Sequence, residues 1–325
     1  MSADPQVAAV VVGWNGGSDL VAALDSLGRQ SLPPAEVVVV DNGSVDGSAE
    51  WVAGQPGLRL VRNPRNLGFA VAANQGIAAT TSELVLLLNQ DVVLDPQFLE
   101  VAAHRMATRP EAGAVAPRLR RGEVLDSTGH RLHSSLWVSN RGQGEPDDGR
   151  YGEAEEVFGA SAAAALYRRE MLQDVALEGE VFCARFFAYL EDVDLDFRAR
   201  WRGWSCWYEP GATASHIRGG SGLHRTAAIE RHVLTNRFLL LERVAPPSWR
   251  RGRGQLRPRA LLLLRCGLAA RRHPAALLGV VDAARQLGAA RRDWRRIWSA
   301  RRVEEAEILR WAAPTPWRRL LRRSN

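Results

Sequence analysis

Three acidic clusters and one histidine follow one another along the first two thirds of the chain. The clusters are residues 41–48, 89–91 and 191–196, and the histidine is His216. Each of the first two clusters directly follows a valine- or leucine-rich run that is typical of a buried strand. Open α/β sheets bind ligands beyond the carboxyl ends of their strands, so we expect these polar side chains to form one site.

The first two clusters contain side chains that suit a nucleotide and a divalent cation. Asp41 stands at a strand end beside Asn42 and Ser44, and it can accept hydrogen bonds from a base or a ribose. An ordinary turn would use the same residue types. Asp91 offers a carboxylate of the kind that Mg²⁺ or Mn²⁺ binds when substrate phosphates supply further oxygen ligands.

The third cluster crowds four carboxylates into six residues, which is costly on one helix unless a cation or an arginine compensates. A carboxylate within reach of a hydroxyl can act as its general base. The alternative is a helix N-terminus that carries its preferred acids and is followed by arginines. Taken alone, His216 would be interpreted as a structural histidine. The support for a joint site is therefore the order in which the three clusters and His216 follow one another along the chain.

The elements around these clusters alternate between strand and helix. We predict strands over residues 7–12, 36–40 and 84–88, and helices over residues 18–29, 68–79 and 96–106. This alternation is typical of a parallel, doubly wound α/β sheet. A further helix over residues 191–201 is expected to turn Val193, Phe197 and Trp201 to the core and its acids to the remaining faces. The polar, glycine-rich residues 142–152 predict a mobile surface loop.

The charge of the 325-residue chain is divided unevenly. The net charge is +7, but residues 1–225 carry −9 and residues 226–325 carry +16. All 43 basic residues are arginine, which excludes chemistry based on a Schiff-base or Walker lysine. The three cysteines are expected to be packing residues. No run of apolar residues reaches the ~18 that a membrane span needs.

The basic part of the chain predicts helices in which arginine alternates with leucine and tryptophan, notably over residues 291–298 and 311–323. Such helices can lie on an anionic membrane surface with tryptophan at the interface. A solvated basic face over an ordinary helical core explains the pattern equally well.

Taken in order, residues 37–48, 66–77, 84–93 and 187–204, followed by His216, resemble the family 2 glycosyltransferases. The segment 189–195, Tyr-Leu-Glu-Asp-Val-Asp-Leu, is the most specific part of this likeness, which covers about residues 7–222. The resemblance is to the rhamnosyltransferase-like bacterial branch. It implies a GT-A fold, a doubly wound and mostly parallel α/β sheet, in a domain of residues 1–225 followed by a helical extension of residues 226–325.

The resemblance also implies roles for particular residues. The nucleotide would be bound by Val12, Trp14, Asp41, Asn42, Ser44, Gly68 and Asn89. A metal ion, Mg²⁺ or Mn²⁺, would be held by Asp91 and His216. Asp192 would be the catalytic base that deprotonates an acceptor hydroxyl, and Glu191 would orient that base or the acceptor. Asn89 replaces the first acid of the family's D-x-D motif, which would weaken the metal site.

The implied reaction is a single inverting displacement from a nucleotide-diphosphate sugar to a hydroxyl of a glycan or lipid-linked acceptor, in the synthesis of cell-surface glycans. The Asn-x-Asp form at residues 89–91 and the segment 125–129 suggest deoxythymidine-diphosphate (dTDP) rhamnose as donor. Only the final Arg-Trp of the processive synthases' signature is present, at Arg200 and Trp201, so one sugar per encounter is expected. The expected location is cytoplasmic, at the inner face of the cell membrane.

Two other classes of protein remain possible from the residues themselves. A metal-dependent nucleotidyltransferase could use a similar sheet, but residues 13–18 lack the basic residue expected in its glycine-rich loop. A non-enzymatic protein could bind nucleic acid or membrane through the basic tail. No zinc-finger or RNA-binding signature accompanies that tail, so a nucleic-acid partner is not expected.

Overall fold

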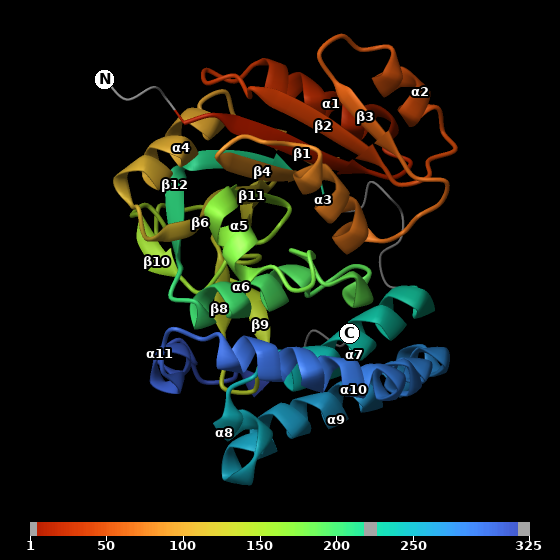
Figure 1. The fold of residues 1–325 in the computed structure, drawn as a ribbon, viewed down its shortest axis with the longest axis vertical. Helices are drawn as coiled ribbons and strands as arrows, with labels where there is room; N and C mark the ends of the chain where they lie inside the picture. Colours follow the sequence, from red (N-terminus) through yellow and green to blue (C-terminus); the bar gives the residue numbers. More distant parts are fainter. Residues whose placement is uncertain (1–4, 218–225, 318–325) are drawn as a thin grey trace.

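A mixed β-sheet and a layer of C-terminal helices make up the protein (Figure 1). The computed structural model describes residues 5–217 and 226–317. The strands of the large sheet run in the order β10-β12-β6-β11-β4-β1-β2-β3. Their bounds are β1 Val7–Gly13, β2 Glu36–Asp41, β3 Arg59–Arg62, β4 Leu84–Asn89, β6 Ala112–Arg121, β10 Glu155–Val157, β11 Ala164–Arg168 and β12 Ser205–His216.

The parallel arrangement predicted from the sequence is found in the N-terminal half of this sheet. β1 pairs in parallel with β2 and β4, and β2 pairs in parallel with β3. Beyond β4 the sheet is mixed, because β11 runs antiparallel to both β4 and β6. Four short strands complete this region: β5 (Val92–Leu94) pairs with β12, β7 (Val124–Ser127) pairs with β6, and β8 (His130–Leu132) forms a separate two-stranded sheet with β9 (Val138–Asn140).

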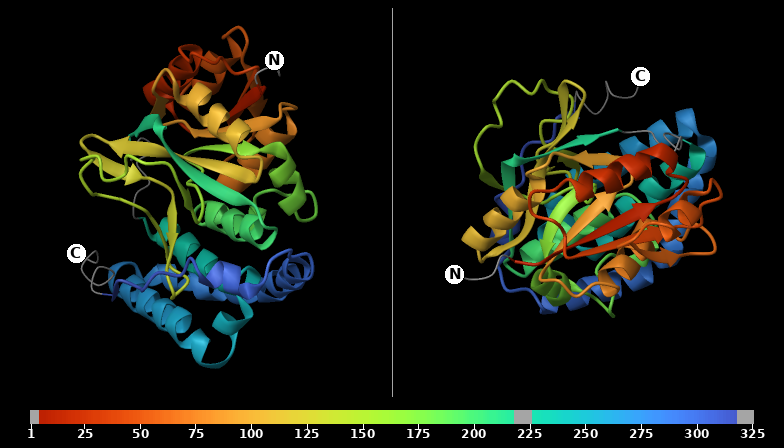
Figure 2. Two further views of the ribbon diagram at one scale, coloured as in Figure 1. Left: turned by 90° about the vertical axis from the view of Figure 1, so that its left-hand side faces the viewer. Right: turned by 90° about the horizontal axis from the view of Figure 1, so that it is seen from above.

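Helices cover both faces of the sheet, and β1 is accordingly buried on both of its sides (Figure 2). Ala9 and Val11 pack toward α1 (Gly17–Gly28) and α4 (Phe98–Thr108), whereas Val10 packs toward α3 (Phe69–Ala78) and α5 (Arg169–Val175). The predicted helices in this part are confirmed to within about two residues. A short helix, α2 (Ser48–Ala53), follows β2, and α6 (Glu191–Trp201) has the predicted bounds.

The C-terminal part is helical, as predicted. It comprises α7 (Ala227–Arg243), α8 (Pro247–Arg250), α9 (Leu256–Arg272), α10 (Leu278–Ser299) and α11 (Glu305–Leu309), with 3₁₀ turns η2 (Gly252–Gln255) and η3 (Pro274–Leu277). A further 3₁₀ turn, η1 (Ala184–Phe186), precedes α6. Among the described helices, none combines the length and the apolar character that crossing a bilayer requires. Residues 311–316 are irregular, contrary to the predicted helix, whose remainder falls largely outside the described residues.

The helical extension shares a core with α6. Phe197 and Trp201 of α6 pack in one apolar cluster with Leu239, Ile297 and other side chains of the extension. The Trp201 ring meets Trp298 edge-on at 5.4 Å, and Trp298 in turn stacks on Trp294. For the arginine- and tryptophan-rich segment of α10, the sequence left open a membrane surface and an ordinary helical core. Trp298 of this segment packs against α6, and contact of the segment with a membrane stays a prediction. The domain boundary predicted after residue 225 falls at the end of residues 218–225, which lie outside the described residues.

A buried ion network joins the same elements. Asp194 of α6 is fully buried and accepts hydrogen bonds from Arg198 Nε at 2.8 Å and from Arg243 Nε of α7 at 2.6 Å. Arg243 also pairs with Asp293 of α10, which pairs with Arg185. Burial alone would raise the pKa of Asp194, but the charges of Arg243 and Arg198 outweigh it and lower that pKa. The expectation that the α6 acids face outward is therefore wrong for Asp194 and for Asp196, which is also buried.

The predicted surface loop at residues 142–152 is irregular, but part of it is fixed to the sheet. Leu125 of β7 accepts a hydrogen bond from the Gly144 amide at 2.8 Å and donates one to the Glu145 carbonyl at 2.9 Å. Its mobility stays a prediction.

Candidate active site

The two residues predicted to hold a metal ion lie side by side. β12 ends at His216, opposite Val92 of β5, and the Ile217 amide donates to the Asp91 carbonyl at 2.8 Å. This pairing leaves His216 Nε2 3.4 Å from Asp91 Oδ1. The other ring nitrogen, Nδ1, lies 2.9 Å from Oδ2 of Asp126, which is fully buried at the end of β7.

Asp126 orients the His216 ring and determines which ring nitrogen is left to bind a metal ion. A hydrogen bond from Nδ1–H to a carboxylate leaves the Nε2 lone pair for a metal, which is the usual support of a metal-binding histidine. Burial lowers the pKa of His216, but the hydrogen bonds with Asp126 and Asp91 outweigh it and raise that pKa. Sequence reasoning noticed Asp126 only as part of a donor-related segment, because its partner is ninety residues away in the chain.

The donor set fits a divalent cation that a substrate completes. In the described part of the chain, no three histidine, cysteine or acidic side chains converge closely enough to cage a metal ion. Asp91 and His216 would supply two ligands, and the remaining positions suit diphosphate oxygens and water, as is common for Mg²⁺ and Mn²⁺.

Most of the residues predicted to bind the nucleotide lie at neighbouring strand ends. Val12 of β1 is paired with Asn89 of β4, and Gly13 is paired with Asp41 of β2. Trp14 follows directly and is held at both ends of its backbone by Gln90, whose Oε1 accepts from the Trp14 amide at 2.6 Å and whose Nε2 donates to the Trp14 carbonyl at 3.1 Å. Gln90 was missed as a site residue because glutamine in a strand-end motif has no distinctive chemistry.

Three of the predicted nucleotide ligands are engaged within the protein. Asn42 is buried; its amide nitrogen donates to the Gly68 carbonyl at 3.2 Å, and its oxygen accepts from the Leu67 amide at 3.0 Å. Ser44 Oγ accepts from the Asn15 amide at 2.8 Å. Gly68 has φ +89°, and a Cβ there would lie 2.5 Å from the Phe187 carbonyl oxygen. The close approach that requires glycine is thus made to the segment before α6, and direct contact of these residues with a nucleotide stays a prediction.

The segment before α6 has an unusual backbone. Phe187, Tyr189 and Leu190 all have positive φ, which is uncommon for large side chains and persists only when surrounding contacts enforce it. The amide of Asn236 on α7 supplies that enforcement, because it donates to the carbonyls of Phe186, Ala188 and Tyr189 at 2.7 to 2.9 Å. The helical extension therefore sets the position at which α6 begins, and with it the position of Asp192.

Asp192 and the residues after β4 are connected through one short segment. The Ala162 amide points to Asp192 Oδ2 at 3.4 Å, and the next residue, Ala163, accepts a hydrogen bond from the Asn89 amide at 2.8 Å. Asp192 Oδ1 accepts from the Val193 amide at 2.8 Å. The side chain is 17% exposed, so the predicted base is accessible rather than sealed in the core.

Glu191 differs sharply from its neighbour. Its side chain is buried, and Oε2 has no hydrogen-bond partner among the described residues. Burial and the adjacent charge of Asp192 raise the pKa of Glu191 well above its usual range. This shift favours the protonated form of Glu191, which can donate a hydrogen bond.

Comparison with known proteins identifies the class. The family model described as "Glycosyl transferase family 2" matches residues 9–176, and the chain belongs to this family of glycosyltransferases. The chain is 28% identical over 290 residues to an N-acetylglucosaminyl-diphospho-decaprenol L-rhamnosyltransferase of Mycobacterium tuberculosis, a match that spans 80% of this chain and 93% of the relative.

Solved structures confirm the GT-A fold. The mannosyltransferase PcManGT from Pyrobaculum calidifontis, in complex with GDP-Man and Mn²⁺, aligns with a TM-score of 0.54 at 20% identity and covers 92% of this chain and 85% of its own. GalNAc-T7 with UDP, GalNAc and Mn²⁺ aligns with a TM-score of 0.58 at 16% identity, over 74% of this chain and 48% of its own. The predictions of family, fold and glycosyltransferase class are confirmed.

Proposed function

We propose that this enzyme is a metal-dependent, inverting rhamnosyltransferase that moves one sugar from dTDP-rhamnose to a hydroxyl of a lipid-linked acceptor. The observation that carries the proposal is the link between Asp192 and the Asn89–Asp91 motif through Ala162 and Ala163. A general base and a metal-binding carboxylate held at one end of the same sheet suit a displacement at a sugar carbon between them.

In the proposed reaction, Asp192 accepts the proton of the acceptor hydroxyl as that oxygen attacks the anomeric carbon. The bond from this carbon to the diphosphate oxygen breaks on the opposite face, so the configuration inverts and no glycosyl-enzyme intermediate forms. Glu191, in the protonated form that its raised pKa favours, is suited to donate a hydrogen bond to the acceptor. A bound Mg²⁺ or Mn²⁺ would neutralise charge on the departing diphosphate.

The choice of donor and acceptor is supported by the relative from M. tuberculosis, whose name specifies an L-rhamnosyl transfer to a diphospho-decaprenol-linked sugar. The alignment spans nearly all of that protein, including part of the helical extension of this chain. Manganese in two structurally similar glycosyltransferases supports the use of a divalent cation.

A donor screen with purified full-length protein tests this function. The protein is mixed with Mn²⁺ and an acceptor, N-acetylglucosamine linked to a short-chain polyprenyl diphosphate. Four donors are compared in separate reactions: dTDP-rhamnose, UDP-glucose, GDP-glucose and dTDP-glucose. We expect transfer from dTDP-rhamnose that is lost in Asp192→Asn and kept in Asp25→Asn, an exposed position on α1. Transfer from another donor alone would replace the rhamnose assignment, and full activity of Asp192→Asn would overturn the catalytic role.

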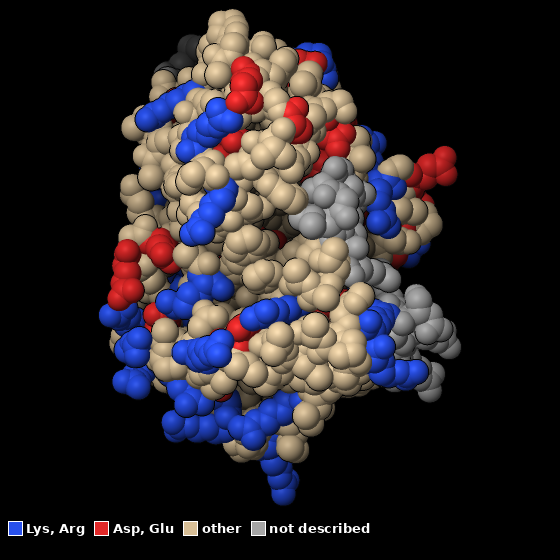
Figure 3. Space-filling model, turned by 90° about the vertical axis from the view of Figure 1, so that its right-hand side faces the viewer, with Lys and Arg blue, Asp and Glu red and all other residues tan. Residues whose placement is uncertain are grey.

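We also propose that the enzyme works in the cytoplasm at the inner face of the membrane, through a surface formed by α9, η3 and the start of α10. Arginine side chains gather over the C-terminal helices, whereas most acidic ones lie over the sheet (Figure 3). An exposed apolar stripe runs along this surface, with Leu263 74% exposed. The stripe consists of Leu256, Ala260, Leu263, Gly267, Leu277, Leu278 and Val281, and exposed Arg257, Arg259 and Arg271 flank it.

Apolar side chains ringed by arginines suit the headgroup region of an anionic bilayer, where each basic residue contributes about 1 kcal/mol. Sedimentation with vesicles of phosphatidylglycerol and phosphatidylcholine tests the surface. Leu263→Glu and Leu278→Glu should release the protein, whereas Val45→Glu, at a position that is 90% exposed but far from α9 in the chain, should not. Unchanged binding of the double variant Leu263→Glu/Leu278→Glu would exclude this surface.

A further inference from the structure

His130 lies directly behind Asp192, in a place that the proposed reaction does not use. Its Nδ1 atom is 2.6 Å from Asp196 Oδ2, and its Nε2 atom is 3.8 Å from Asp192 Oδ2. The imidazole is almost completely buried, as is Asp196. One histidine from β8 thus stands between two carboxylates of α6.

The spacing on α6 explains why a group of this kind is needed. Asp192 and Asp196 are four residues apart and share a helix face, where like charges destabilise each other. Asp196 is also buried, and an unpaired buried carboxylate is strongly unfavourable. Among the described ion pairs, those of Asp196 are made with His130 alone. Burying the Asp196 carboxylate is energetically unfavourable, and it lies beside the base of a displacement reaction. We therefore expect Asp196 to have a function in that reaction.

The surroundings hold Asp196 in one orientation. Its second oxygen, Oδ1, accepts a hydrogen bond from the Ala160 amide at 3.1 Å. A Cβ on Gly159 would lie 1.9 Å from the Asp196 carboxyl group, so only glycine leaves room for it. The His130 amide in turn donates to the Gly159 carbonyl at 2.7 Å, which fixes β8 against the same segment.

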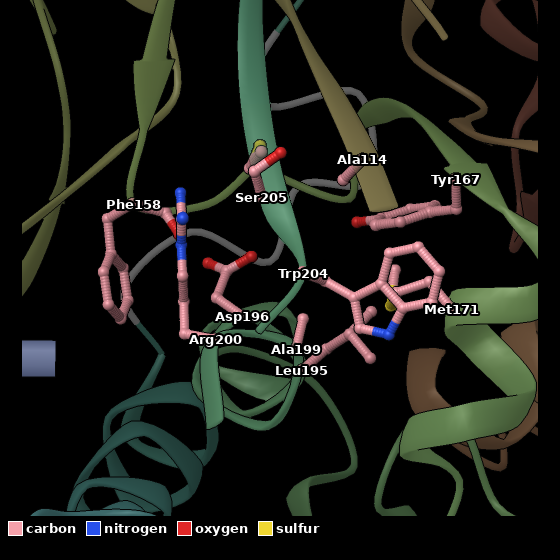
Figure 4. Close-up of a pocket in the computed structure, with 11 residues that line it drawn as sticks. Ala114, Phe158, Tyr167, Met171, Leu195, Asp196, Ala199, Arg200, Trp204 and Ser205 are labelled. Atoms are coloured by element: carbon pink, nitrogen blue, oxygen red, sulfur yellow. The ribbon is translucent and has the colours of Figure 1, made fainter. Parts of the chain in front are cut away.

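Two other polar side chains near Asp196, those of Arg200 and Trp204, form hydrogen bonds with other groups. Figure 4 shows the Asp196 carboxylate rising from α6 between Arg200 and Trp204, toward a small pocket that Tyr167 also lines. Arg200 Nε donates to the Phe158 carbonyl at 2.9 Å, and Trp204 Nε1 donates to Asp174 at 2.9 Å. The imidazole is therefore the group that connects Asp196 to Asp192.

We propose that His130, oriented by Asp196, is a positioning residue for the catalytic base: its imidazolium directs Nε2–H toward Asp192 Oδ2 and holds that carboxylate in the orientation that receives the acceptor proton. This inference rests on the proposed role of Asp192. His130 does not touch the substrate and transfers no proton in the reaction. It offsets the negative charge that Asp196 adds behind the base, and it restricts rotation of the Asp192 carboxylate.

The charge states around His130 agree with this role. Burial lowers the pKa of His130, but the carboxylates of Asp196 and Asp192 outweigh it and raise that pKa. Burial raises the pKa of Asp196 to about 6, with His130 opposing the shift. The other groups near these carboxylates are Glu191 on α6, Asn140 on β9, Tyr167 on β11 and Cys206 on β12. Burial raises the pKa of Tyr167 and of Cys206, which keeps both neutral at pH 7, and burial and the charge of Asp192 raise the pKa of Glu191, which favours its neutral form.

Two substitutions separate positioning from simple structural support. In His130→Asn, the amide nitrogen can replace Nδ1 beside Asp196 but cannot reach Asp192; in His130→Gln, the longer amide can replace Nε2. We expect kcat to fall roughly 10- to 100-fold in His130→Asn, within the contribution of general-base catalysis, and by less in His130→Gln. The KM for dTDP-rhamnose and the affinity for dTDP should stay unchanged in both, because the nucleotide site is elsewhere.

The pH profile supplies a second readout. In the wild type, kcat should decline below about pH 6 as Asp196 takes up a proton, and again at alkaline pH as the imidazolium is lost. The alkaline decline should be absent from His130→Gln. A purely structural role would lower the melting temperature without removing that limb of the profile.

His133→Gln is the matched control. His133 is also buried and directly follows β8, but it stacks on Trp137 and its Nε2 contacts Ser139. We expect this variant to lose stability and to keep its kcat. Wild-type kcat in His130→Asn, or an equal loss in His133→Gln, would overturn the inference. Failure of the wild type to transfer sugar would overturn the proposed function itself, a separate result.

Discussion

His216 Nε2 lies 3.4 Å from Asp91 Oδ1 because β12 returns antiparallel to β5 and ends beside the turn that follows β4. Asp91 lies in a D-x-D-like motif whose first acid is replaced by Asn89, His216 belongs to no local metal motif, and no two of the acidic clusters are adjacent in the chain. The pairing of the short strand β5 with the end of β12 therefore creates the arrangement from which metal binding is proposed. Asp126, at the end of a third strand, completes it by fixing the ring of His216.

Asp126 should determine metal affinity although it is not a proposed ligand. We predict that Asp126→Asn weakens Mn²⁺ binding about 10- to 100-fold in the presence of dTDP, the usual effect of removing a partner of a metal-binding histidine. Titration calorimetry or the EPR signal of free Mn²⁺ measures this. Asp148→Asn, at an exposed carboxylate paired with Arg150, should bind Mn²⁺ normally. Normal affinity in Asp126→Asn together with weak binding in Asp91→Asn would show that Asp126 does not orient the ring.

Gln90 should influence nucleotide binding through Trp14. Replacing Gln90 with leucine removes both hydrogen bonds that hold the Trp14 backbone and leaves a side chain of similar length. We predict at least a tenfold rise in the dissociation constant for dTDP, measured by calorimetry, with Mn²⁺ affinity retained. Gln55→Leu, at a less buried glutamine at the end of α2, should bind dTDP like the wild type. Equal affinities in the two variants would contradict a role for the Trp14 position.

Gly159 should be intolerant of even one added methyl group. In Gly159→Ala the new Cβ would overlap the Asp196 carboxyl, so Asp196 and His130 must move. We predict a loss of about 1–3 kcal/mol in the free energy of unfolding, typical of an overpacked site. Chemical denaturation measures this change. Gly28→Ala, where a Cβ would meet no atom within 4 Å, should keep wild-type stability; a tolerated Gly159→Ala would mean that the segment 159–163 adjusts freely.

The Asp194 ion pair should dominate the acid stability of the connection between α6 and α7. Arg243→Leu leaves Asp194 buried with one arginine fewer, and breaking a buried pair of this kind costs about 3–5 kcal/mol. The pKa of Asp194 is lowered in the folded protein, so this contribution is present above its unfolded pKa of about 3.9 and is lost as pH falls through the folded value.

Urea unfolding at pH 7 and at more acid pH tests that prediction. The difference between the wild type and Arg243→Leu should be largest at pH 7 and should shrink as the solution is acidified below pH 4. Arg296→Gln, which removes an exposed pair with Glu178, should unfold like the wild type at both pH values. A difference that is independent of pH would locate the effect in packing rather than in charge.

The sequence predicts the parallel half of the sheet well because strand and helix periods alternate clearly there. β1, β2 and β4 are continuous apolar runs, and each is followed by turn residues. The mixed half was not predicted in detail, because β7, β8, β9 and β10 are only three or four residues long. Strands of that length have too few alternating positions to be distinguished from loops.

The candidate site could be predicted where residues act alone and not where they act in pairs. Asp91, Asp192 and His216 were named through the resemblance to the family 2 glycosyltransferases, because each matches a single position of that pattern. Gln90, Asp126 and His130 matter through long-range hydrogen bonds, which no local pattern indicates. Asn42 was also named as a nucleotide ligand; its side chain is hydrogen-bonded to the loop before α3, and its contact with a nucleotide stays a prediction.

The contacts of Asn236 mean that the start of α6 and the helical extension cannot be exchanged independently between related enzymes. A chimera that replaces α7 would lose Asn236, whose amide donates to three backbone carbonyls in the segment before Asp192. It would also leave Asp194 without its partner Arg243. To engineer a new acceptor preference, η1, α6, α7 and α10 should therefore be kept together or exchanged together. Substitutions should be confined to those of their side chains that face solvent.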